Sequence, residues 1–231
     1  MNYYTEKSNS YFSFFREDIY TILKQTGKYE RALEVGCGNG SLLNLLKKEK
    51  IVKSVVGIEP YGLLEPGSNF DEYYPDSIIN VLPNISKLGK FDLIIFSDVL
   101  EHLEDPWSIL NVICKEALNI NGTVIVSIPN FRNFLTLSKI LLHNSFKYES
   151  EGVLDKTHLR FFCKKDIEEM LINAGLEIRL LTPAFKYRKT IFFKKKNRYK
   201  YINNITLNIF PFWLTQQIIA VAIKKNIQIP T

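Results

Sequence analysis

The sequence predicts a doubly wound α/β fold, in which helices cover both faces of a mostly parallel sheet. Short apolar, β-branched runs alternate with amphipathic stretches, as in repeated strand–helix units. The strand-like runs are apolar at successive positions, which is typical of strands buried on both faces. A glycine-rich turn follows the first of these runs, at the place where such sheets bind ligands. These three observations predict an α/β domain with a ligand site at the carboxyl ends of its strands.

The strands differ in how clearly the sequence marks them. The clear ones are predicted at 31–35, 54–58, 91–96 and 123–128. A weak signal at 69–74 predicts a short edge strand. Toward the end of the chain, 176–181 and 218–223 predict two strands without a clear crossover helix between them. This arrangement indicates an antiparallel hairpin at the edge of the sheet.

Helices are predicted between these strands from apolar residues at helical spacing. They cover 13–25, 41–48, 106–118, 130–143 and 164–174. Asp105 is predicted to cap the third helix, with Pro106 in its first position. Gly175 is predicted to end the last helix.

The composition is that of an ordinary globular protein, with 46% apolar and 23% charged residues. A chain of 231 residues suits one elaborated domain better than two. No apolar run reaches the roughly 18 residues of a membrane-spanning helix. The polar N-terminus lacks the apolar run of a secretory signal, so the sequence predicts a cytoplasmic protein. Cys37, Cys114 and Cys163 form no C-x-x-C pair, which favours buried side chains over a zinc knuckle or disulfides.

The glycine-rich turn is the sharpest motif. Residues 34–40 read E-V-G-C-G-N-G between a predicted strand and a predicted helix. Gly36, Gly38 and Gly40 allow the backbone to turn sharply and to approach a ligand closely. Glu59 ends the next strand, where an acid accepts hydrogen bonds from both hydroxyls of a ribose. The pattern therefore predicts a nucleoside cofactor.

This turn resembles motif I of the class I S-adenosylmethionine (SAM)-dependent methyltransferases. Its third glycine comes one residue earlier than in the G-x-G-x-x-G turn of NAD enzymes, which favours SAM. Residues 91–106, FDLIIFSDVLEHLEDP, resemble a second stretch of the same family, and the resemblance extends from about 11 to 224. The family implies a Rossmann-like sheet of seven strands whose last strand is antiparallel.

The resemblance also implies where SAM binds. Glu34 and the glycines after it would line the methionine part, Glu59 would hold the ribose, and Asp76 would approach the adenine. Asp98 would lie beside the methionyl or sulfonium region, and Arg16 would pair with the SAM carboxylate. The full set implied to bind SAM is Arg16, Glu34, Gly36, Cys37, Gly38, Gly40, Glu59, Pro60, Asp76, Ser77, Asp98 and Val99.

The same resemblance divides the single methyltransferase domain, 1–231, into three parts. They are an N-terminal helical lid at 1–28, a SAM-binding core at 29–183, and a basic insertion with a closing edge strand at 184–231. Eight Lys and Arg residues crowd 186–200. Such a block attracts phosphate-bearing acceptors or an anionic membrane surface, unless it is a solvated loop. Peripheral contact with the inner membrane face is therefore an alternative. A nucleic-acid partner is not expected, because no recognised RNA-binding motif accompanies the basic residues.

Two histidines are candidate catalytic residues. Methyl transfer to a hydroxyl uses a base near the carboxyl ends of the central strands. His102 follows a predicted central strand within L-E-H. His158 lies in a stretch that resembles one crossing over the acceptor site in the family, where it would act as a base or orient the acceptor. A structural histidine that closes a loop through hydrogen bonds stays open as the alternative. His143, at a helix end, is expected to be exposed.

Residues 98–102, DVLEH, also resemble the metal-binding stretch of the small-RNA 2′-O-methyltransferases. Such a site needs a second acid–histidine pair further along the chain. Glu149, Glu151 and His158 match this requirement poorly in spacing. The sequence therefore predicts no metal.

The leading functional interpretation is O-methylation of a sugar, a polysaccharide precursor or another small acceptor. It depends on the P-N turn at 129–130 and on 157–162, which resemble methyltransferases of bacterial surface polysaccharides. An N-methyltransferase of a small amine is a second interpretation, since an amine needs no strong base. A non-catalytic SAM-binding regulatory or partner protein is a third, and it would bind SAM without turnover.

Overall fold

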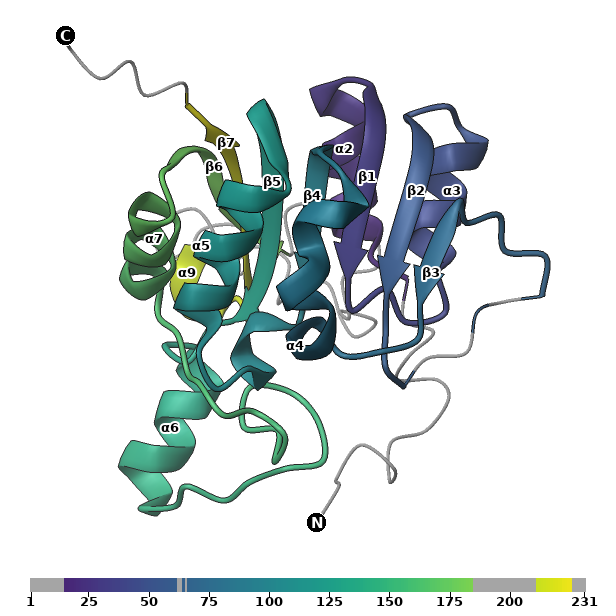
Figure 1. The fold of residues 1–231 in the computed structure, drawn as a ribbon. Coiled ribbons are helices and arrows are strands. Elements are labelled where there is room, and N and C mark those ends of the chain that lie inside the picture. Colours follow the sequence, from purple (N-terminus) through teal and green to yellow (C-terminus); the bar gives the residue numbers. More distant parts are fainter. Residues whose placement is uncertain (1–14, 62–63, 65, 185–210, 226–231) are drawn as a thin grey trace, which may run out of the picture.

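A computed structural model describes residues 15–61, 64, 66–184 and 211–225. Within this part, seven strands form one sheet in the order β3-β2-β1-β4-β5-β7-β6 (Figure 1). The strands are β1 (Tyr29–Val35), β2 (Val52–Ile58), β3 (Glu72–Tyr74), β4 (Phe91–Ser97), β5 (Leu118–Pro129), β6 (Leu176–Pro183) and β7 (Gln217–Lys224). Strands β1 to β5 pair in parallel, and β7 is antiparallel to both of its neighbours. The predicted Rossmann-like fold with an antiparallel last strand is confirmed.

The position of the last strand corrects one prediction. The two closing strands form an antiparallel pair at the edge of the sheet, as predicted, but β7, which was expected to close that edge, lies between β5 and β6, so that β6 is the edge strand. Ala222 pairs with Val124 on one side and with Ile178 on the other. Five successive residues of β7 are buried, which is the pattern of an inner strand covered on both faces. The edge position follows from taking the last strand in the chain as the outermost strand, whereas the continuous apolar run of β7 indicates an inner strand.

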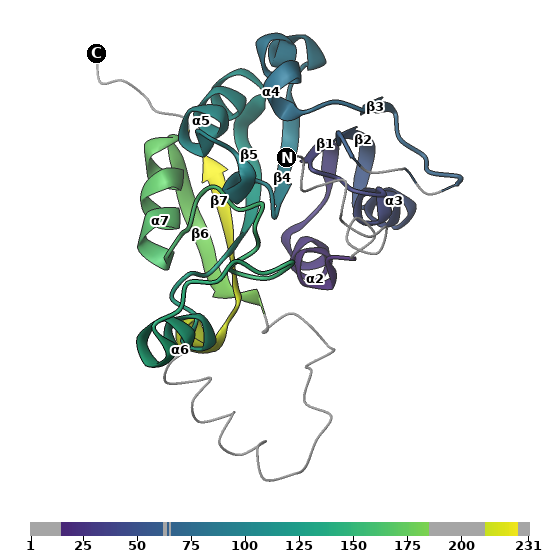
Figure 2. The same ribbon diagram turned by 90° about the horizontal axis from the view of Figure 1, so that it is seen from below.

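The helices cover both faces of the sheet, as predicted. They are α2 (Glu17–Thr26), α3 (Ser41–Lys48), α4 (Ile78–Val81), α5 (Pro106–Glu116), α6 (Phe134–His143), α7 (Lys164–Asn173) and α9 (Pro211–Leu214), with 3₁₀ turns η2 (Leu82–Leu88) and η3 (Leu100–His102). One apolar core joins α2 and α3 to the sheet, and a second joins α4, α5 and α7 to the opposite face (Figures 1 and 2). Along β4, Leu93 and Ile95 enter the first core, and Ile94 and Phe96 enter the second.

Several helix boundaries differ from the predictions; α2, for example, begins at Glu17 rather than at residue 13. The helix predicted at 106–118 ends at Glu116, because Leu118 already begins β5. The helix predicted from residue 130 begins at Phe134, where the Asn133 side chain caps its first turn. Asn130 is 1% exposed and donates to the carbonyls of Phe212 and Thr215, so its amide supports the fold rather than lining an open acceptor mouth.

Other local predictions are confirmed. Asp105 caps α5 by accepting a hydrogen bond from Ser108 N at 3.0 Å. Gly175 follows α7 with a φ of 77°. No helix in the described part of the chain is long and apolar enough to cross a bilayer. The basic block at 186–200 and the first half of the predicted lid, 1–14, lie outside the described residues.

Candidate cofactor and acceptor site

The glycine-rich turn joins the carboxyl ends of three neighbouring strands. It follows β1, and the N–H groups of Gly36 and Cys37 donate to the carbonyl of Ile58 at the end of β2, at 2.8 and 3.3 Å. A Cβ at Gly36 would lie only 2.3 Å from Cγ2 of Val99, which follows β4. Glycine is therefore required where the turn packs against the loop after β4.

Glu59 is joined to the same turn. Its side chain is buried, and its carboxylate accepts hydrogen bonds from Gly38 N at 3.0 Å and Tyr61 N at 2.8 Å. Gly38 has a φ of 54°, in the left-handed region that glycine enters without steric cost. The acid and the turn thus lie together as the cofactor interpretation requires. Contact between Glu59 and a ribose stays a prediction.

Glu34 supplies a buried carboxylate beside the turn. It is 3% exposed, and its Oε2 has no hydrogen-bond partner among the described residues. Burial raises the pKa of Glu34 from 4.5 to about 8; the nearby Arg16 opposes this shift and the charge of Glu59 adds to it. An unpaired buried carboxylate oxygen costs free energy, and an ammonium group would satisfy it. The site therefore fits the amino group of the methionine part of SAM.

This raised pKa predicts how stability depends on pH. From pH 4.5 to about 8, the folded chain keeps the Glu34 proton that the unfolded chain releases. The contribution of Glu34 is therefore fully present at low pH and is lost as the pH rises, by up to roughly 1.4 kcal/mol per pH unit. Glu34→Gln cannot ionise, so its unfolding free energy should increasingly exceed that of the wild type across this window and then level off. Urea unfolding measures both curves, and parallel curves would contradict the prediction.

Arg16 is held in a buried network at the ends of β4 and β5. It is 4% exposed, and its guanidinium donates to Asp98 at 2.6 Å and to Ser127 at 2.7 Å. Burial alone would lower the pKa of Arg16, but Asp98 and Asp18 outweigh it and keep the guanidinium charged. Arg16 thus lies at the carboxyl ends of the strands, as predicted, where it pairs with the carboxylates of Asp98 and Asp18. Its contact with the SAM carboxylate stays a prediction.

Asp98 occupies a strained position in this network. Its φ of 56° lies in the left-handed region, which a non-glycine residue rarely adopts. Asp98 N donates to Ser127 O at 3.1 Å, and the carboxylate also accepts from the Gln217 amide of β7. Such strain persists where the surroundings fix it, and it clusters at binding sites. No local motif marks Ser127 or Gln217 as a partner of Asp98, because polar residues at strand ends meet only in the fold.

The two candidate histidines lie together although they are distant in sequence. The ring centroids of His102 and His158 are 4.7 Å apart. The carbonyl of Glu101 accepts from Leu159 N at 2.8 Å and Arg160 N at 3.0 Å, which ties η3 to the segment that carries His158. Each ring also contacts a backbone carbonyl through Nδ1, so both histidines help to close loops. For both histidines, a structural role in closing a loop is therefore compatible with a catalytic role.

The Glu101 carboxylate lies within 4.8 Å of a ring nitrogen of each histidine. It is 1% exposed, and His158 Nε2 is 4.0 Å from its Oε1. Burial, with the charge of Asp98 adding to it, raises the pKa of the Glu101 carboxyl well above its usual range. The sequence marked Glu101 only as part of the D-V-L-E-H stretch, because a glutamate in such a motif carries no sign of burial.

Other predicted cofactor residues lie outside these contacts. Asp76 and Ser77 lie at the start of α4, where Ser77 caps the helix and the Asp76 carboxylate accepts from Asn80 Nδ2 at 2.7 Å. Pro60 is exposed after Glu59. Cys37 is buried in the turn, as expected for a small apolar side chain, and burial raises the pKa of its thiol. The adenine contact of Asp76 and Ser77 stays a prediction.

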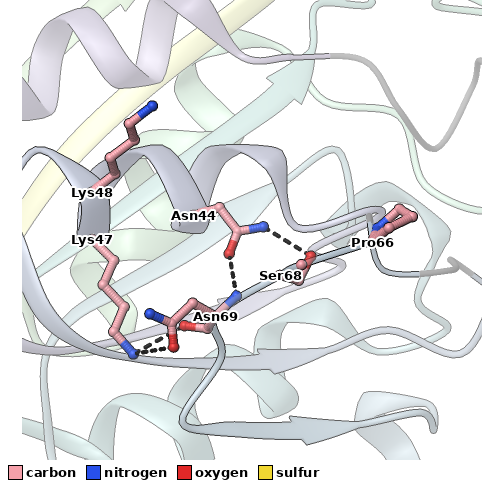
Figure 3. A pocket seen from close by; sticks show the side chains of 7 residues that line it. Asn44, Lys47, Lys48, Pro66, Ser68 and Asn69 are labelled. Atoms are coloured by element: carbon pink, nitrogen blue, oxygen red, sulfur yellow. Dashed lines mark hydrogen bonds between the residues drawn. The ribbon is translucent and has the colours of Figure 1, made fainter.

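A hollow of about 400 Å³ lies beside α3, lined by Asn44, Lys47, Lys48, Pro66, Gly67, Ser68 and Asn69 (Figure 3). Its polar groups bond to one another: Asn44 Nδ2 donates to Ser68 Oγ, and Asn69 N donates to Asn44 Oδ1, both at 3.0 Å. Lys47 Nζ donates to Asn69 O at 2.9 Å. These contacts fasten the loop before β3 to α3. Because the lining groups satisfy one another, the hollow is a less suitable ligand site than the strand ends.

An aromatic cluster borders the histidines. The Phe161 ring centroid lies 5.2 Å from Phe131, 5.7 Å from Phe146 and 6.5 Å from His158. Phe146 is 43% exposed and Tyr148, which contacts it, is 52% exposed. The cluster offers a partly open aromatic surface next to His158, suited to an apolar or aromatic ligand.

Comparisons with known proteins agree with the fold and with a methyltransferase domain. A family model described as a methyltransferase domain matches residues 9–181. The chain is similar to the ubiquinone biosynthesis O-methyltransferase of Marinobacter nauticus, with 28% identity over 162 residues, 66% of each chain. It is 33% identical over 119 residues to that of Pasteurella multocida, covering 46% of this chain and 48% of that protein. The chain thus spans less than two thirds of these relatives.

The fold is also similar to that of a solved structure. A SAM-dependent methyltransferase from Archaeoglobus fulgidus matches with a TM-score of 0.59 and 18% identity, over 93% of this chain and 97% of that one. At this identity the match supports the fold alone.

Proposed function

The chain belongs to the class I SAM-dependent methyltransferases, and we propose that it transfers a methyl group from SAM to a hydroxyl oxygen of a small acceptor. The observation that carries this proposal is the His102–His158 pair at the carboxyl edge of the sheet, where Glu34 and Glu59 also lie at the ends of β1 and β2. Ligands of such sheets bind at this edge. The names of the curated relatives, both O-methyltransferases, support an oxygen acceptor.

In this proposal the chain's own residues hold the cofactor. Glu34 receives the ammonium of the methionine part through its buried Oε2, Glu59 accepts the ribose hydroxyls, and the glycine turn lies against the cofactor between them. Bound SAM supplies a methyl group already activated on a sulfonium, so the protein mainly has to position the acceptor and to receive its proton.

The histidine pair would serve the acceptor. Because a carbonyl oxygen only accepts hydrogen bonds, the Nδ1 atoms that face Thr157 O and Val153 O carry the protons of the neutral rings. Nε2 of His102 or His158 then has the lone pair that a general base or an acceptor-orienting group needs. An amine acceptor would not require this arrangement.

For the acceptor, the aromatic cluster around Phe161 favours an aromatic hydroxyl, and the ubiquinone-related names of the relatives agree. The sugar or polysaccharide-precursor hydroxyl expected from the sequence is the second candidate, because aromatic faces also pack against sugar rings. Methylation of an aromatic hydroxyl and methylation of a sugar hydroxyl are both O-methylation.

A panel of phenols, sugar nucleotides and small amines, supplied with isotope-labelled SAM, tests the proposal. We expect labelled methyl on a phenolic oxygen, located by mass spectrometry. Label on a sugar oxygen would select the second candidate. Label on nitrogen would replace the proposal with N-methylation. SAM binding without transfer to any member of the panel, or to acceptors in a cell extract, would favour a regulatory or partner protein.

We also propose that the basic block at 186–200 binds a phosphate-bearing acceptor or an anionic membrane surface, which would place the protein peripherally at the inner membrane face. Replacing Lys194, Lys195 and Lys196 with Gln should weaken binding to anionic vesicles or to a phosphate-bearing acceptor and reduce its salt dependence, with unchanged SAM affinity. A control with the same charge loss replaces the exposed Lys48, Lys53 and Lys87. Equal binding by the two triple variants would show that the block is a solvated loop.

A further inference from the structure

We propose that Arg16 is a positioning residue for SAM binding, which acts by holding Asp98 and does not contact the SAM carboxylate. The resemblance to the family implied such a contact. The structure gives the guanidinium a complete set of partners within the protein. Three observations support the proposal: the hydrogen bonds of Arg16, the charge balance around it, and the way in which Asp98 is held.

The hydrogen bonds of Arg16 use its whole donor capacity. A guanidinium carries five N–H groups. Nε and Nη2 donate to the two carboxylate oxygens of Asp18, at 2.9 and 3.2 Å, and Nη2 also donates to Ser127 Oγ at 2.7 Å. Nη1 donates to Asp98 Oδ2 at 2.6 Å and to Ser97 Oγ at 3.2 Å. Because Arg16 is only 4% exposed, a SAM carboxylate would have to displace one of these acceptors.

The network around Arg16 contains one cation and two carboxylates. The guanidinium pairs with Asp18, whose side chain is fully buried, and with Asp98, whose side chain is 29% exposed. One negative charge is therefore left over, and Asp98 is the carboxylate that reaches the surface. A third carboxylate, that of SAM, would add to this excess, whereas a cation would balance it. The ammonium and sulfonium of SAM therefore suit Asp98 better than the SAM carboxylate suits Arg16.

Asp98 is held at both oxygens of its carboxylate. Arg16 Nη1 donates to Oδ2, and the Gln217 amide donates to Oδ1. The Asp98 backbone has a φ of 56°, a strained conformation that persists only where the surroundings fix it. Removing the guanidinium would take away a charged partner of this carboxylate and allow it to turn. Arg16 thus positions Asp98, and Asp98 is the group that would meet the cofactor.

The same network joins α2 to the ends of β4 and β5. Asp18, in the first turn of α2, binds Arg16 and also accepts from Ile19 N at 2.9 Å. Arg16 in turn reaches Ser97 at the end of β4 and Ser127 in β5. Without the guanidinium, the start of α2 loses these ties to the sheet. We therefore expect the amide hydrogens of α2 to exchange faster in an Arg16 variant, even without a cofactor.

Calorimetric titration with SAM and with decarboxylated SAM, without an acceptor, tests the proposal. Decarboxylated SAM lacks the carboxylate but keeps the amine and the sulfonium. We expect Arg16→Gln to weaken the binding of both ligands by the same factor, roughly tenfold, which is a usual coupling between members of one hydrogen-bond network. The matched control is Arg179→Gln, which makes the same change at an exposed position on β6 and should bind both ligands like the wild type.

Two further variants separate positioning from loss of the fold. Arg16→Lys keeps the charge beside Asp98, so it should fold and recover part of the affinity that Arg16→Gln loses. Asp98→Asn should weaken binding about as much as Arg16→Gln does, and adding Arg16→Gln to it should weaken binding by less than about twofold more. Circular dichroism and thermal unfolding check each variant, and hydrogen exchange of ligand-free α2 reports the loss of the network.

Loss of affinity for SAM but not for decarboxylated SAM, in Arg16→Gln or Arg16→Lys, would show that Arg16 binds the carboxylate and would overturn the proposal. A full Arg16→Gln effect in the Asp98→Asn background, or unchanged affinity in a folded Arg16→Gln variant, would do so as well. The inference rests on the proposed cofactor site but not on the acceptor, so methylation of nitrogen rather than oxygen would leave it standing. A wild type that binds neither ligand would remove the cofactor site and this inference together.

Discussion

His158→Ala is expected to lower methyl transfer to a hydroxyl acceptor by roughly 10²–10⁴-fold, the usual contribution of a positioned acid–base group. The His158 ring lies against His102, and neither histidine is among the residues that the resemblance assigns to SAM. The affinity for S-adenosylhomocysteine (SAH), the demethylated product, should therefore stay nearly unchanged. His102→Ala should act in the same direction. Single-turnover transfer from labelled SAM, together with calorimetric SAH binding, measures both quantities.

The third histidine provides the control. His143 ends α6, is exposed, and lies outside the His102–His158 pair, so His143→Ala should leave the transfer rate unchanged. Loss of the rate in His158→Ala with a shifted pH profile and unchanged SAH affinity would identify a base. If neither His102→Ala nor His158→Ala slows transfer, the histidines are structural, and an amine acceptor or catalysis by positioning alone becomes the better account.

Gly38→Arg is expected to abolish binding of SAM and SAH. Gly38 lies in the turn with a φ of 54°, and its N–H donates to the Glu59 carboxylate. An arginine there adds a backbone cost of about 1–2 kcal/mol and places a long charged side chain over the turn, where the cofactor would lie. Calorimetry should show no SAH binding at concentrations that saturate the wild type.

The matched control separates loss of the site from loss of the fold. Gly175→Arg introduces the same residue at another left-handed glycine, φ 77°, with open space around it. Gly175 precedes β6 at the amino ends of the parallel strands, whereas the candidate site lies at their carboxyl ends. Both variants should unfold at similar temperatures, but only Gly38→Arg should lose SAH. Retained affinity in a folded Gly38→Arg variant would remove the glycine turn from the cofactor site.

Local sequence signals predicted the parts of the fold that local physics determines. The turn at 34–40 and α3 at Ser41–Lys48 agree with the structure, because glycine conformation and helical spacing act over a few residues. Asp105 was predicted as a cap for the same reason. Strand order is a non-local property, and this is why β7 was placed at the edge although its continuous apolar run indicated an inner strand.

The candidate site likewise combines residues that local motifs predict with residues that only the fold brings together. Glu59 and the glycines were found because their chemistry follows from position after a strand. The cluster of Glu101 with His158, and the ties of Asp98 to Ser127 and Gln217, arise from segments that meet only in the fold. Burial also decides what these groups do. The pKa values of Glu34 and Glu101 are raised by desolvation, which depends on the packing around each carboxyl and has no counterpart in a sequence motif.

Calorimetric titration of SAH into the wild type and into Glu59→Ala tests the central claim most directly. The claim is that a nucleoside cofactor binds at the carboxyl ends of β1, β2 and β4 and is held there by Glu59. We predict one SAH per chain, and a loss in the variant of roughly 2–4 kcal/mol, because two hydrogen bonds to a charged group disappear. Glu59→Gln, which keeps one acceptor oxygen, should lose less. A loss below about 0.5 kcal/mol in a folded Glu59→Ala variant, or no SAH binding by the wild type, would contradict the account.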